Sequence, residues 1–253
     1  MVDYELHGRT AVIIINRPEA RNAVNGDVAD GVEAAIDRLE DDPEVWAGVL
    51  TGAGPVFCAG ADLKLFASGA DRLMFTKRGG FGGLVRRDRT KPLIAAVEGA
   101  ALAGGCELAL ACDLIVSSSA ARFGLPEVTR SLVASAGGLV KLPRLLPRRV
   151  ALQMILTGEP IGADRAYHFG LVNELCEPGF AVETSLALAG RINANAPLAV
   201  RHSRRIAVDS ADKDPEVVWH EGFDAQNAIR GSDDWKEGPR AFVEKRPARW
   251  TGR

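Results

Sequence analysis

Short apolar runs in the first half of the chain alternate with a helical pattern, and this alternation limits the folds that the sequence can adopt. The runs have the character of buried strands and cover Ala11–Asn16, Val45–Thr51, Leu93–Val97 and Leu114–Ser118. Between the first two runs, apolar residues three or four positions apart define one face of a helix: Val28, Val32, Ile36 and Leu39. Strands that alternate with helices predict an α/β fold.

Two helices in this half have recognisable ends. Asn25 is a residue type that caps helices and stands just before the first helical pattern, which Asp41–Pro43 ends. The pair Gly104–Gly105 opens a second, strongly apolar helix that continues to Ala111. The stretch Gly69–Thr90 is less regular, so it is either a mobile segment beside a site or a solvated helix with a loop.

Beyond Pro143 the strand signals fade and helical patterns follow one another. Glycines and prolines separate the expected helices, which are Ala163–Phe169, Ala181–Asn193, Leu198–Val208, Glu216–Arg230 and Asp234–Glu244. We therefore predict two parts. Residues 1–160 form the core that carries the functional site, and residues 161–253 form a helical region.

Composition and charge narrow the classes of function. The 253 residues include 31 Lys and Arg against 33 Asp and Glu, a net charge of −2, so no basic excess favours nucleic acid as a partner. No apolar stretch approaches the ~18 residues of a membrane span, and the opening with Asp3, Glu5 and His7 does not resemble a signal peptide. The four cysteines form no Cys-x-x-Cys pair, which fits a reducing compartment, and the four histidines lack a metal-binding spacing. We expect a soluble cytoplasmic protein with no metal, no membrane partner and no nucleic-acid partner.

The stretch Leu102–Asp113 (LAGGCELALACD) is the strongest candidate for a site. A glycine pair directly before a helix leaves free backbone N–H groups at the positive end of the helix dipole. Such groups suit an anion, an oxyanion or a polarised carbonyl. Glu107 lies in the first turn among apolar residues. It is therefore either a reactive carboxylate with a perturbed pKa or a charge that complements the helix N-terminus.

A second carboxylate follows in the stretch Phe123–Val128 (FGLPEV). Taken by itself, Glu127 fits an acidic residue at the start of a helix, after Pro126. It lies 20 residues after Glu107, and the expected strand Leu114–Ser118 lies between them, so a return loop can bring the two face to face. Two carboxylates in one cleft can divide acid and base roles when their environments separate their pKa values.

A third stretch, Pro55–Lys64 (PVFCAGADLK), also combines a strand end with small residues. Gly60 and Ala61 offer accessible backbone there, and Lys64 is either a phosphate contact or a solvated lysine. Cys58 has no identifiable base partner, so we expect it to fill space rather than to act as a nucleophile.

Together these stretches resemble the enoyl-CoA hydratase/isomerase family, also called the crotonase family. The similar segments run from Asn16 to Arg246 and read NRPEARNAV, FCAGADLK, KPLIAAVEGAALAGGCELALACD, FGLPEV, LTGEPIGADRAYHFGLVNEL and GPRAFVEKR. The resemblance implies an α/β fold with a crotonase-like spiral of ββα repeats in residues 1–160, followed by a helical trimerisation region. It further implies a homotrimer, or a hexamer made of two trimers.

The same resemblance assigns roles to individual residues. The backbone N–H groups of Ala61 and Gly104 match the family's oxyanion hole for the thioester carbonyl, and Glu107 and Glu127 match the two catalytic glutamates of its hydratases. The positions that match substrate- and CoA-binding regions are Ala23, Ala59, Ala61, Asp62, Leu63, Lys64, Gly104, Phe242 and Lys245.

Because both glutamates are present, the resemblance implies an enoyl-CoA hydratase, a hydro-lyase that adds water reversibly to the α,β double bond of a 2-enoyl-CoA. CoA would belong to the substrate, and no further cofactor is expected. The turn before Glu107 reads AGGCE where many hydratases have GGGCE. The stretch after Glu127 reads TRSLVASAGG, where members often have a glycine and a proline, and its Ser131, Ala134 and Ser135 change the wall expected for the acyl pocket. One alternative is a Δ3,Δ2-enoyl-CoA isomerase or a relative of the carnitinyl-CoA dehydratases, whose C-terminal sequences the ending GPRAFVEKRPARWTGR resembles. The other is a non-catalytic acyl-CoA-binding protein.

Overall fold

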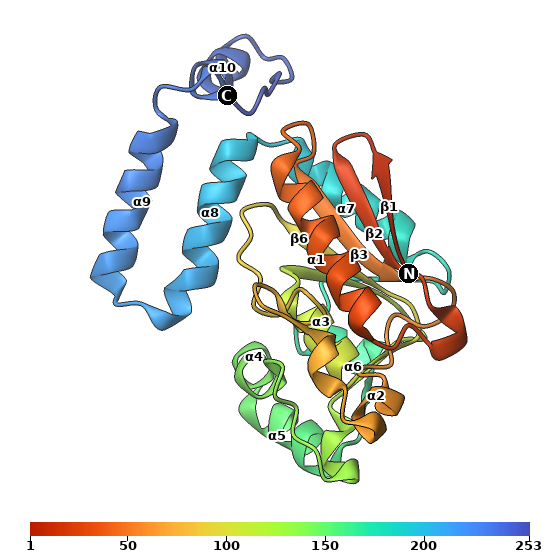
Figure 1. The fold of residues 1–253 in the computed structure, drawn as a ribbon. Coiled ribbons are helices and arrows are strands. Elements are labelled where there is room, and N and C mark those ends of the chain that lie inside the picture. Colours follow the sequence, from red (N-terminus) through yellow and green to blue (C-terminus); the bar gives the residue numbers. More distant parts are fainter.

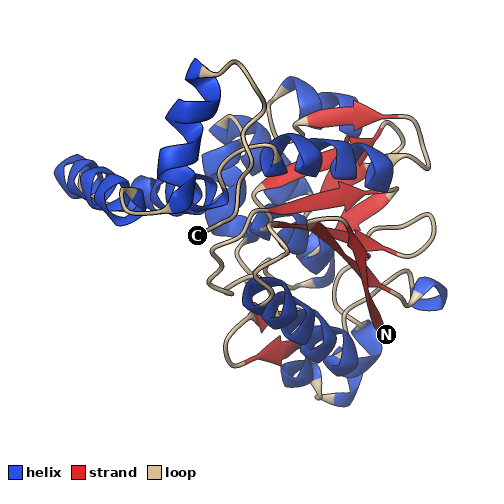
Figure 2. Cartoon of the chain, turned by 90° about the horizontal axis from the view of Figure 1, so that it is seen from above, coloured by secondary structure: helices blue, strands red, loops and turns tan.

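The computed structural model describes residues 1–253 and is built around one six-stranded sheet (Figures 1 and 2). In spatial order its strands are β1 (Val2–His7), β2 (Thr10–Ile15), β3 (Ala47–Gly52), β6 (Leu93–Val97), β8 (Leu114–Ser118) and β11 (Glu174–Cys176). Only β1 runs antiparallel to its neighbour, and every other adjacent pair is parallel. This largely parallel sheet with helices between its strands confirms the predicted α/β class.

Two helices cover the opposite faces of this sheet (Figure 1). Helix α1 (Gly26–Asp41) packs on the face to which Ile13 of β2 points, and α7 (Ala181–Asn193) packs on the face to which Val12 points. Because successive strand residues point to opposite faces, a sheet covered on both sides needs continuous apolar strands, as the run AVIII shows. The Asn25 side chain accepts a hydrogen bond from the Val28 amide at 3.0 Å, which confirms the predicted cap of α1.

The remaining short strands form two small sheets beside the main one. In the first, β10 (Ile161–Gly162) pairs with β9 (Arg122–Gly124), which pairs with β7 (Ala100–Leu102). In the second, β4 (Phe75–Thr76) and β5 (Gly80–Phe81) form a hairpin. The stretch 69–90 thus contains a hairpin and the 3-10 turn Asp71–Met74.

Shorter helices follow the strands and complete the body of the molecule. They are α2 (Leu63–Ser68), α3 (Gly104–Ala111), α4 (Gly138–Leu145), α5 (Arg148–Thr157) and α6 (Ala163–His168), with 3-10 turns at Pro18–Ala20 and Pro126–Arg130. The expected helix from the glycine pair to Ala111 is confirmed as α3, and all of its residues are buried.

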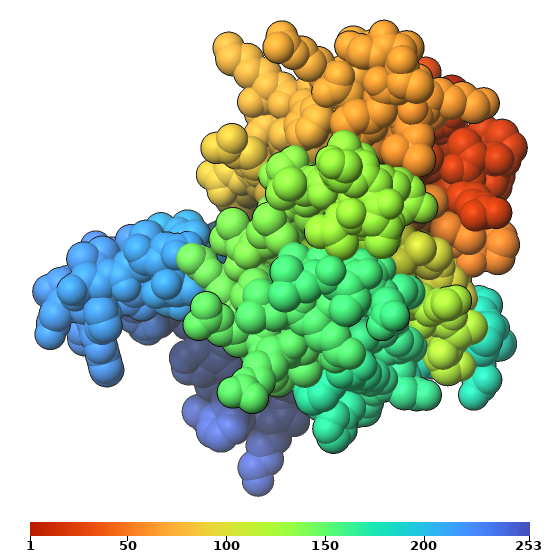
Figure 3. Space-filling view, turned by 90° about the horizontal axis from the view of Figure 1, so that it is seen from below, coloured from red at the N-terminus to blue at the C-terminus, as the bar shows by residue number.

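The last three helices stand apart from the sheet. Helices α8 (Pro197–Asp209) and α9 (Pro215–Ile229) lie side by side as an arm that projects from the body, joined by the turn Ser210–Asp212 (Figures 1 and 3). Helix α10 (Asp233–Val243) follows near the base of this arm (Figure 1). None of the helices in the structure is long and apolar enough to cross a membrane.

The arrangement departs from the sequence prediction in the second half. Residues 174–176 form the edge strand β11, parallel to β8, and α7 covers one face of the sheet, so residues up to 193 belong to the core. The expected boundary at residue 160 therefore lies inside this core, and the separate helices begin at Pro197. The reason is that β11 is only three residues long and partly exposed, too short to give a strand signal.

Candidate active site

A cleft of about 920 Å³ opens between α2, the start of α3 and the turn Pro126–Arg130. Its lining includes nearly all of the residues predicted for the site: Ala23, Ala59, Ala61, Asp62, Leu63, Lys64, Gly104, Glu107 and Glu127. Phe242 and Lys245 lie elsewhere, on α10 and just after it, and Phe242 is 85% exposed. Within one chain the fold thus brings together every predicted site residue except these two.

Glu107 extends from the first turn of α3, a helix whose side chains are all buried. Only 4% of the residue is exposed, and its Oε1 accepts a hydrogen bond from the Gly138 amide at 2.9 Å. The pKa of Glu107 is raised to about 7, chiefly because the carboxyl group is buried; the nearby charge of Glu127 adds to this rise, and backbone hydrogen bonds from Gly138 and Ala136 offset part of it. Near neutral pH this carboxyl group can therefore both accept and release a proton.

Glu127 lies in the 3-10 turn that Pro126 begins and lines the same cleft. It is 9% exposed, and its Oε2 has no hydrogen-bond partner in the chain. Burial raises the pKa of Glu127, which the positive charge of Arg130 partly offsets. An unpaired carboxylate oxygen in a buried position favours the protonated form, which can donate a proton.

The turn before α3 leaves a backbone donor free. Gly104 is the first residue of the helix, and neither a backbone nor a side-chain acceptor in the chain receives its N–H. A side chain is excluded there, because a Cβ on Gly104 would lie 2.4 Å from the ring of Phe81. The preceding Ala103 has φ 52° and ψ −130°, a conformation that glycine adopts far more readily than alanine. The AGGCE sequence thus places an alanine where GGGCE would place glycine.

Ala61 supplies a second backbone donor. The flanking residues both bond to Val24: the Val24 amide donates to the Gly60 carbonyl at 2.8 Å, and the Asp62 amide donates to the Val24 carbonyl at 2.9 Å. In this strand-like pairing the N–H of Ala61 itself points away from Val24 and has no acceptor in the chain. Gly60 has φ +101°, and a Cβ on it would lie 3.1 Å from the Gly104 nitrogen, so the two donor segments approach closely.

The rest of the lining combines apolar and basic groups. Met74, Phe75 and Phe81 line the cleft, so part of the stretch 69–90 lies beside it. Arg17 and Arg21 also line the cleft, and neither is among the site residues predicted from the sequence. The segment NRPEARN carries no chemical motif, and only the fold shows that it returns to the end of β3.

The cysteine next to this site is not reactive. Cys58 is fully buried, and burial raises its pKa to about 12, so the thiol stays protonated near neutral pH. This agrees with the expected packing role.

The fold and this cleft define a class: an α/β protein in which two buried carboxyl groups and two free backbone N–H groups share one pocket. The model of the enoyl-CoA hydratase/isomerase family matches residues 5–253. The chain belongs to this family.

Three relatives illustrate the range of similarity. An enoyl-CoA hydratase of Mycobacterium tuberculosis is 40% identical over 98% of this chain and 96% of its own length. A solved structure of an enoyl-CoA hydratase from the same organism covers 100% of this chain and 99% of that chain, with 47% identity and a TM-score of 0.95. A carnitinyl-CoA dehydratase of Proteus mirabilis is 36% identical over 97% of this chain and 96% of that protein.

Proposed function

We propose that this protein is an enoyl-CoA hydratase, which adds water reversibly across the α,β double bond of a 2-enoyl-CoA thioester. The observation that carries the proposal is the pair of buried glutamates, Glu107 and Glu127, in the cleft that also contains two free backbone N–H groups. The hydratases among its relatives support the same activity.

The two backbone donors act on the thioester carbonyl. As water attacks the β carbon, negative charge develops on the thioester oxygen, and the N–H groups of Ala61 and Gly104 stabilise it. Because both donors are fixed by the fold, they need no rearrangement at the moment of reaction. One such donor is typically worth ~3 kcal/mol of the barrier.

The two carboxyl groups handle the protons. Glu107 holds and activates the water, taking one of its protons as the water oxygen bonds to the β carbon. Glu127 delivers its own proton to the α carbon, so that the product gains one complete water molecule. Proton transfers of this kind contribute ~10²–10⁴-fold to the rate.

The remaining lining holds the rest of the substrate. Ala23, Ala59, Asp62 and Leu63 lie along the proposed path of the CoA chain, and the Lys64 ammonium is available for a phosphate. CoA enters as part of the substrate, so the proposal requires no separate cofactor. Four cysteines without disulfides fit the proposed cytoplasmic location.

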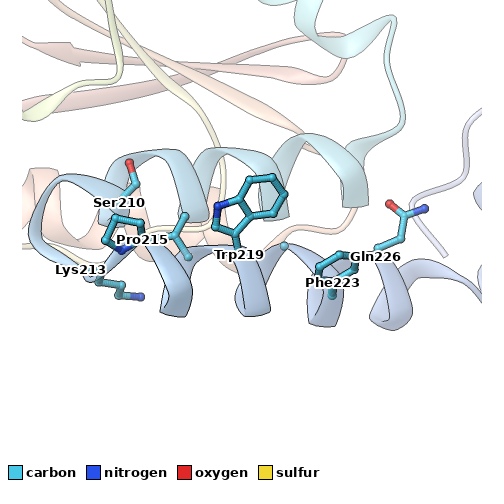
Figure 4. A pocket seen from close by; sticks show the side chains of 8 residues that line it. Ser210, Lys213, Pro215, Trp219, Phe223 and Gln226 are labelled. Atoms are coloured by element: carbon cyan, nitrogen blue, oxygen red, sulfur yellow. The ribbon is translucent and has the colours of Figure 1, made fainter.

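The arm explains why we propose a homotrimer or a hexamer. Apolar side chains along α9 are exposed in the single chain, with Trp219 at 68% and Phe223 at 64%. They line a groove of about 670 Å³ against the end of α8, together with Val218 and Pro215 (Figure 4). A surface of this kind calls for a second copy of the chain. In such an assembly, Phe242 and Lys245 would meet CoA held by a neighbouring protomer.

Labelled water distinguishes the proposal from its alternatives. When the protein acts on a 2-enoyl-CoA in H₂¹⁸O, we expect one ¹⁸O atom in the 3-hydroxyacyl product. An isomerase would shift the double bond of a 3-enoyl-CoA without taking up oxygen. A protein that only binds acyl-CoA would bind CoA thioesters and show no turnover on any chain length.

A further inference from the structure

We infer that Arg17 and Asp62 are positioning residues that hold the Ala61 N–H in the geometry needed for the thioester oxygen. The inference rests on the proposed function, because it concerns the same backbone donor. We call Arg17, Asp62 and the Ala23 carbonyl, to which Arg17 donates a hydrogen bond, the Arg17 clamp.

The contacts of Arg17 join the two segments on either side of Ala61. Its Nη1 donates to the Ala23 carbonyl at 2.8 Å, and its Nη2 donates to Oδ2 of Asp62 at 2.9 Å. Ala23 precedes Val24, the residue that pairs with the backbone around Ala61, and Asp62 directly follows Ala61. One planar guanidinium group therefore fixes the spacing of the two segments whose hydrogen bonds orient the Ala61 peptide.

Asp62 has a second bond that extends the clamp to α2. Its Oδ1 accepts the Lys64 amide at 3.0 Å as the cap of that helix. Burial alone would raise the pKa of Asp62, but the hydrogen bonds from Arg17 and from the Lys64 amide outweigh it and lower the pKa below its usual range. The carboxylate is thus charged at neutral pH and holds both Arg17 and the start of α2.

The loop that carries Arg17 is itself rigidly fixed. The Arg17 amide donates to Oδ1 of Asn22 at 2.9 Å, and the Asn22 amide donates back to the Arg17 carbonyl at 2.9 Å. The Nδ2 of Asn22, a fully buried residue, donates to the carbonyls of Ala53 and Val56 at the end of β3. The loop from which Arg17 contacts Asp62 is therefore held to the end of β3.

Exposure of the pair argues for a role in the cleft. The side chains of Arg17 and Asp62 are 15% and 13% exposed, so both line the cleft while largely shielded from water. In such surroundings an ion pair keeps its geometry better than a surface pair, and removing one partner leaves the other charge uncompensated. The rival role for Arg17 is direct contact with a phosphate of CoA.

The test compares two thioesters of the same enoyl group, one on CoA and one on N-acetylcysteamine, which lacks the nucleotide. For Arg17→Met we expect kcat to fall on the order of 100-fold with both thioesters, because the donor is misplaced, while KM changes little. Arg17→Lys should recover part of the loss, since one ammonium can bond Asp62 or Ala23 but not both in the same plane. Asp62→Asn keeps the cap of α2 and should give a smaller loss in kcat.

A spectroscopic readout makes this test independent of turnover. A conjugated enoyl thioester with an electron-donating substituent absorbs at longer wavelength when its carbonyl is polarised, and we expect the clamp variants to lose part of that shift on binding. If the unaltered protein shifted the spectrum but hydrated nothing, the proposed function would fail while the clamp stood. Arg191→Met, which breaks the exposed pair with Glu174 outside the cleft, is the matched control and should change neither readout.

Two results would overturn the inference. One is a rise in KM confined to the CoA thioester, which would make Arg17 a phosphate contact. The other is an unchanged kcat and spectral shift in Arg17→Met and Asp62→Asn. If Arg17→Met does not fold, Arg17→Lys and Asp62→Asn decide the question by the same criteria, with thermal unfolding as the check on folding.

Discussion

At the scale of single residues, two positions at the site are held in unfavourable states: Glu107 in its ionisation and Ala103 in its backbone conformation. Glu107 is a carboxyl group on a helix whose residues are all buried, and its Oε1 accepts a hydrogen bond from the Gly138 amide. Its pKa of about 7 means that the folded protein binds a proton there more tightly than the unfolded chain does. The ionised form that takes a proton from water is therefore also the form that weakens the fold.

This conflict predicts how Glu107→Gln changes stability with pH. Stability of the natural protein should fall as pH rises from about 4.5, the ordinary pKa, through about 7, because the folded state must give up a proton that it holds tightly. Glutamine keeps the bond to the Gly138 amide and has no charge to bury. At pH 8 we expect the free energy of unfolding of Glu107→Gln to exceed that of the natural protein by up to roughly 3 kcal/mol, since each pKa unit corresponds to about 1.4 kcal/mol.

Urea unfolding at pH 4 and pH 8 measures this effect. The two proteins should be nearly equally stable at pH 4, which lies below both pKa values, because Glu107 is then mostly protonated in the folded and the unfolded state. A variant that is less stable than the natural protein at pH 8 would contradict the raised pKa.

Ala103 is the second such position, because its backbone adopts a conformation that is unfavourable for alanine. Its φ of 52° and ψ of −130° strain an alanine, so Ala103→Gly should relieve strain of about 1 kcal/mol or more. Part of that gain is lost to the greater freedom of glycine in the unfolded chain, and we expect a net rise in stability with turnover retained. Thermal unfolding checks this. Ala101→Gly, a buried position within β7, is the control and should lower stability; equal losses at both positions would mean that Ala103 is not strained.

At the scale of elements, the sequence was most informative where a run was long or strongly apolar. Strands β6 and β8 and helix α7 coincide with the predicted ranges, because continuous burial or a helical face leaves a periodic signal. Strand β1 was not predicted, since it is largely exposed and its sequence VDYELH mixes charged with apolar residues. Its pairing with β2 is a tertiary contact that no local pattern encodes.

The residues of the candidate site also fall into two groups, those that a local sequence pattern predicts and those that only a tertiary contact brings to the site. Gly104, Glu107 and Glu127 lie in local patterns with a chemical meaning, so sequence reasoning could propose them. Arg17 lies 45 residues before Asp62, and their contact depends on the path of the chain between β2 and β3. Residues whose role arises from such contacts could not be predicted from spacing.

Helix α3 gives a prediction at this scale, because its first residue must lack a side chain. Gly104→Ala would push a methyl group into the ring of Phe81, which is itself buried at the cleft wall, and the donor N–H would shift. Loss of one oxyanion donor lowers kcat ~10²–10³-fold, and we expect a fall of that order. Steady-state kinetics measure it.

The matched control for this change is Gly190→Ala. Gly190 is exposed within α7, and its Cβ would meet nothing within 4 Å. Alanine there should leave kcat unchanged and raise stability by up to about 1 kcal/mol, because glycine is a poor helix former. If Gly104→Ala were as active as Gly190→Ala, the donor would have to lie elsewhere.

At the scale of the whole molecule, the arm of α8 and α9 exposes large apolar side chains that a single chain leaves uncovered. Light scattering at micromolar concentration should give a mass of three or six chains of 26.9 kDa. Trp219→Lys puts a charge on the exposed apolar face of α9 and should shift the mass toward one chain. Leu6→Lys, an exposed apolar position on β1, should leave the mass unchanged. A natural protein that runs as a monomer would contradict the assembly and the proposed contacts of Phe242 and Lys245.

The central claim is that two glutamates act together to hydrate an enoyl thioester, and the loss of the conjugated thioester absorbance tests it most directly. Glu107→Gln and Glu127→Gln should each lose most of the rate, on the order of 10²–10⁴-fold, because neither amide can take or give the required proton. The double variant should be scarcely slower than the slower single variant, since groups that act as a unit are not additive. All three should still bind a non-hydrolysable acyl-CoA. Turnover near that of the natural protein in either single variant would contradict the two-glutamate mechanism.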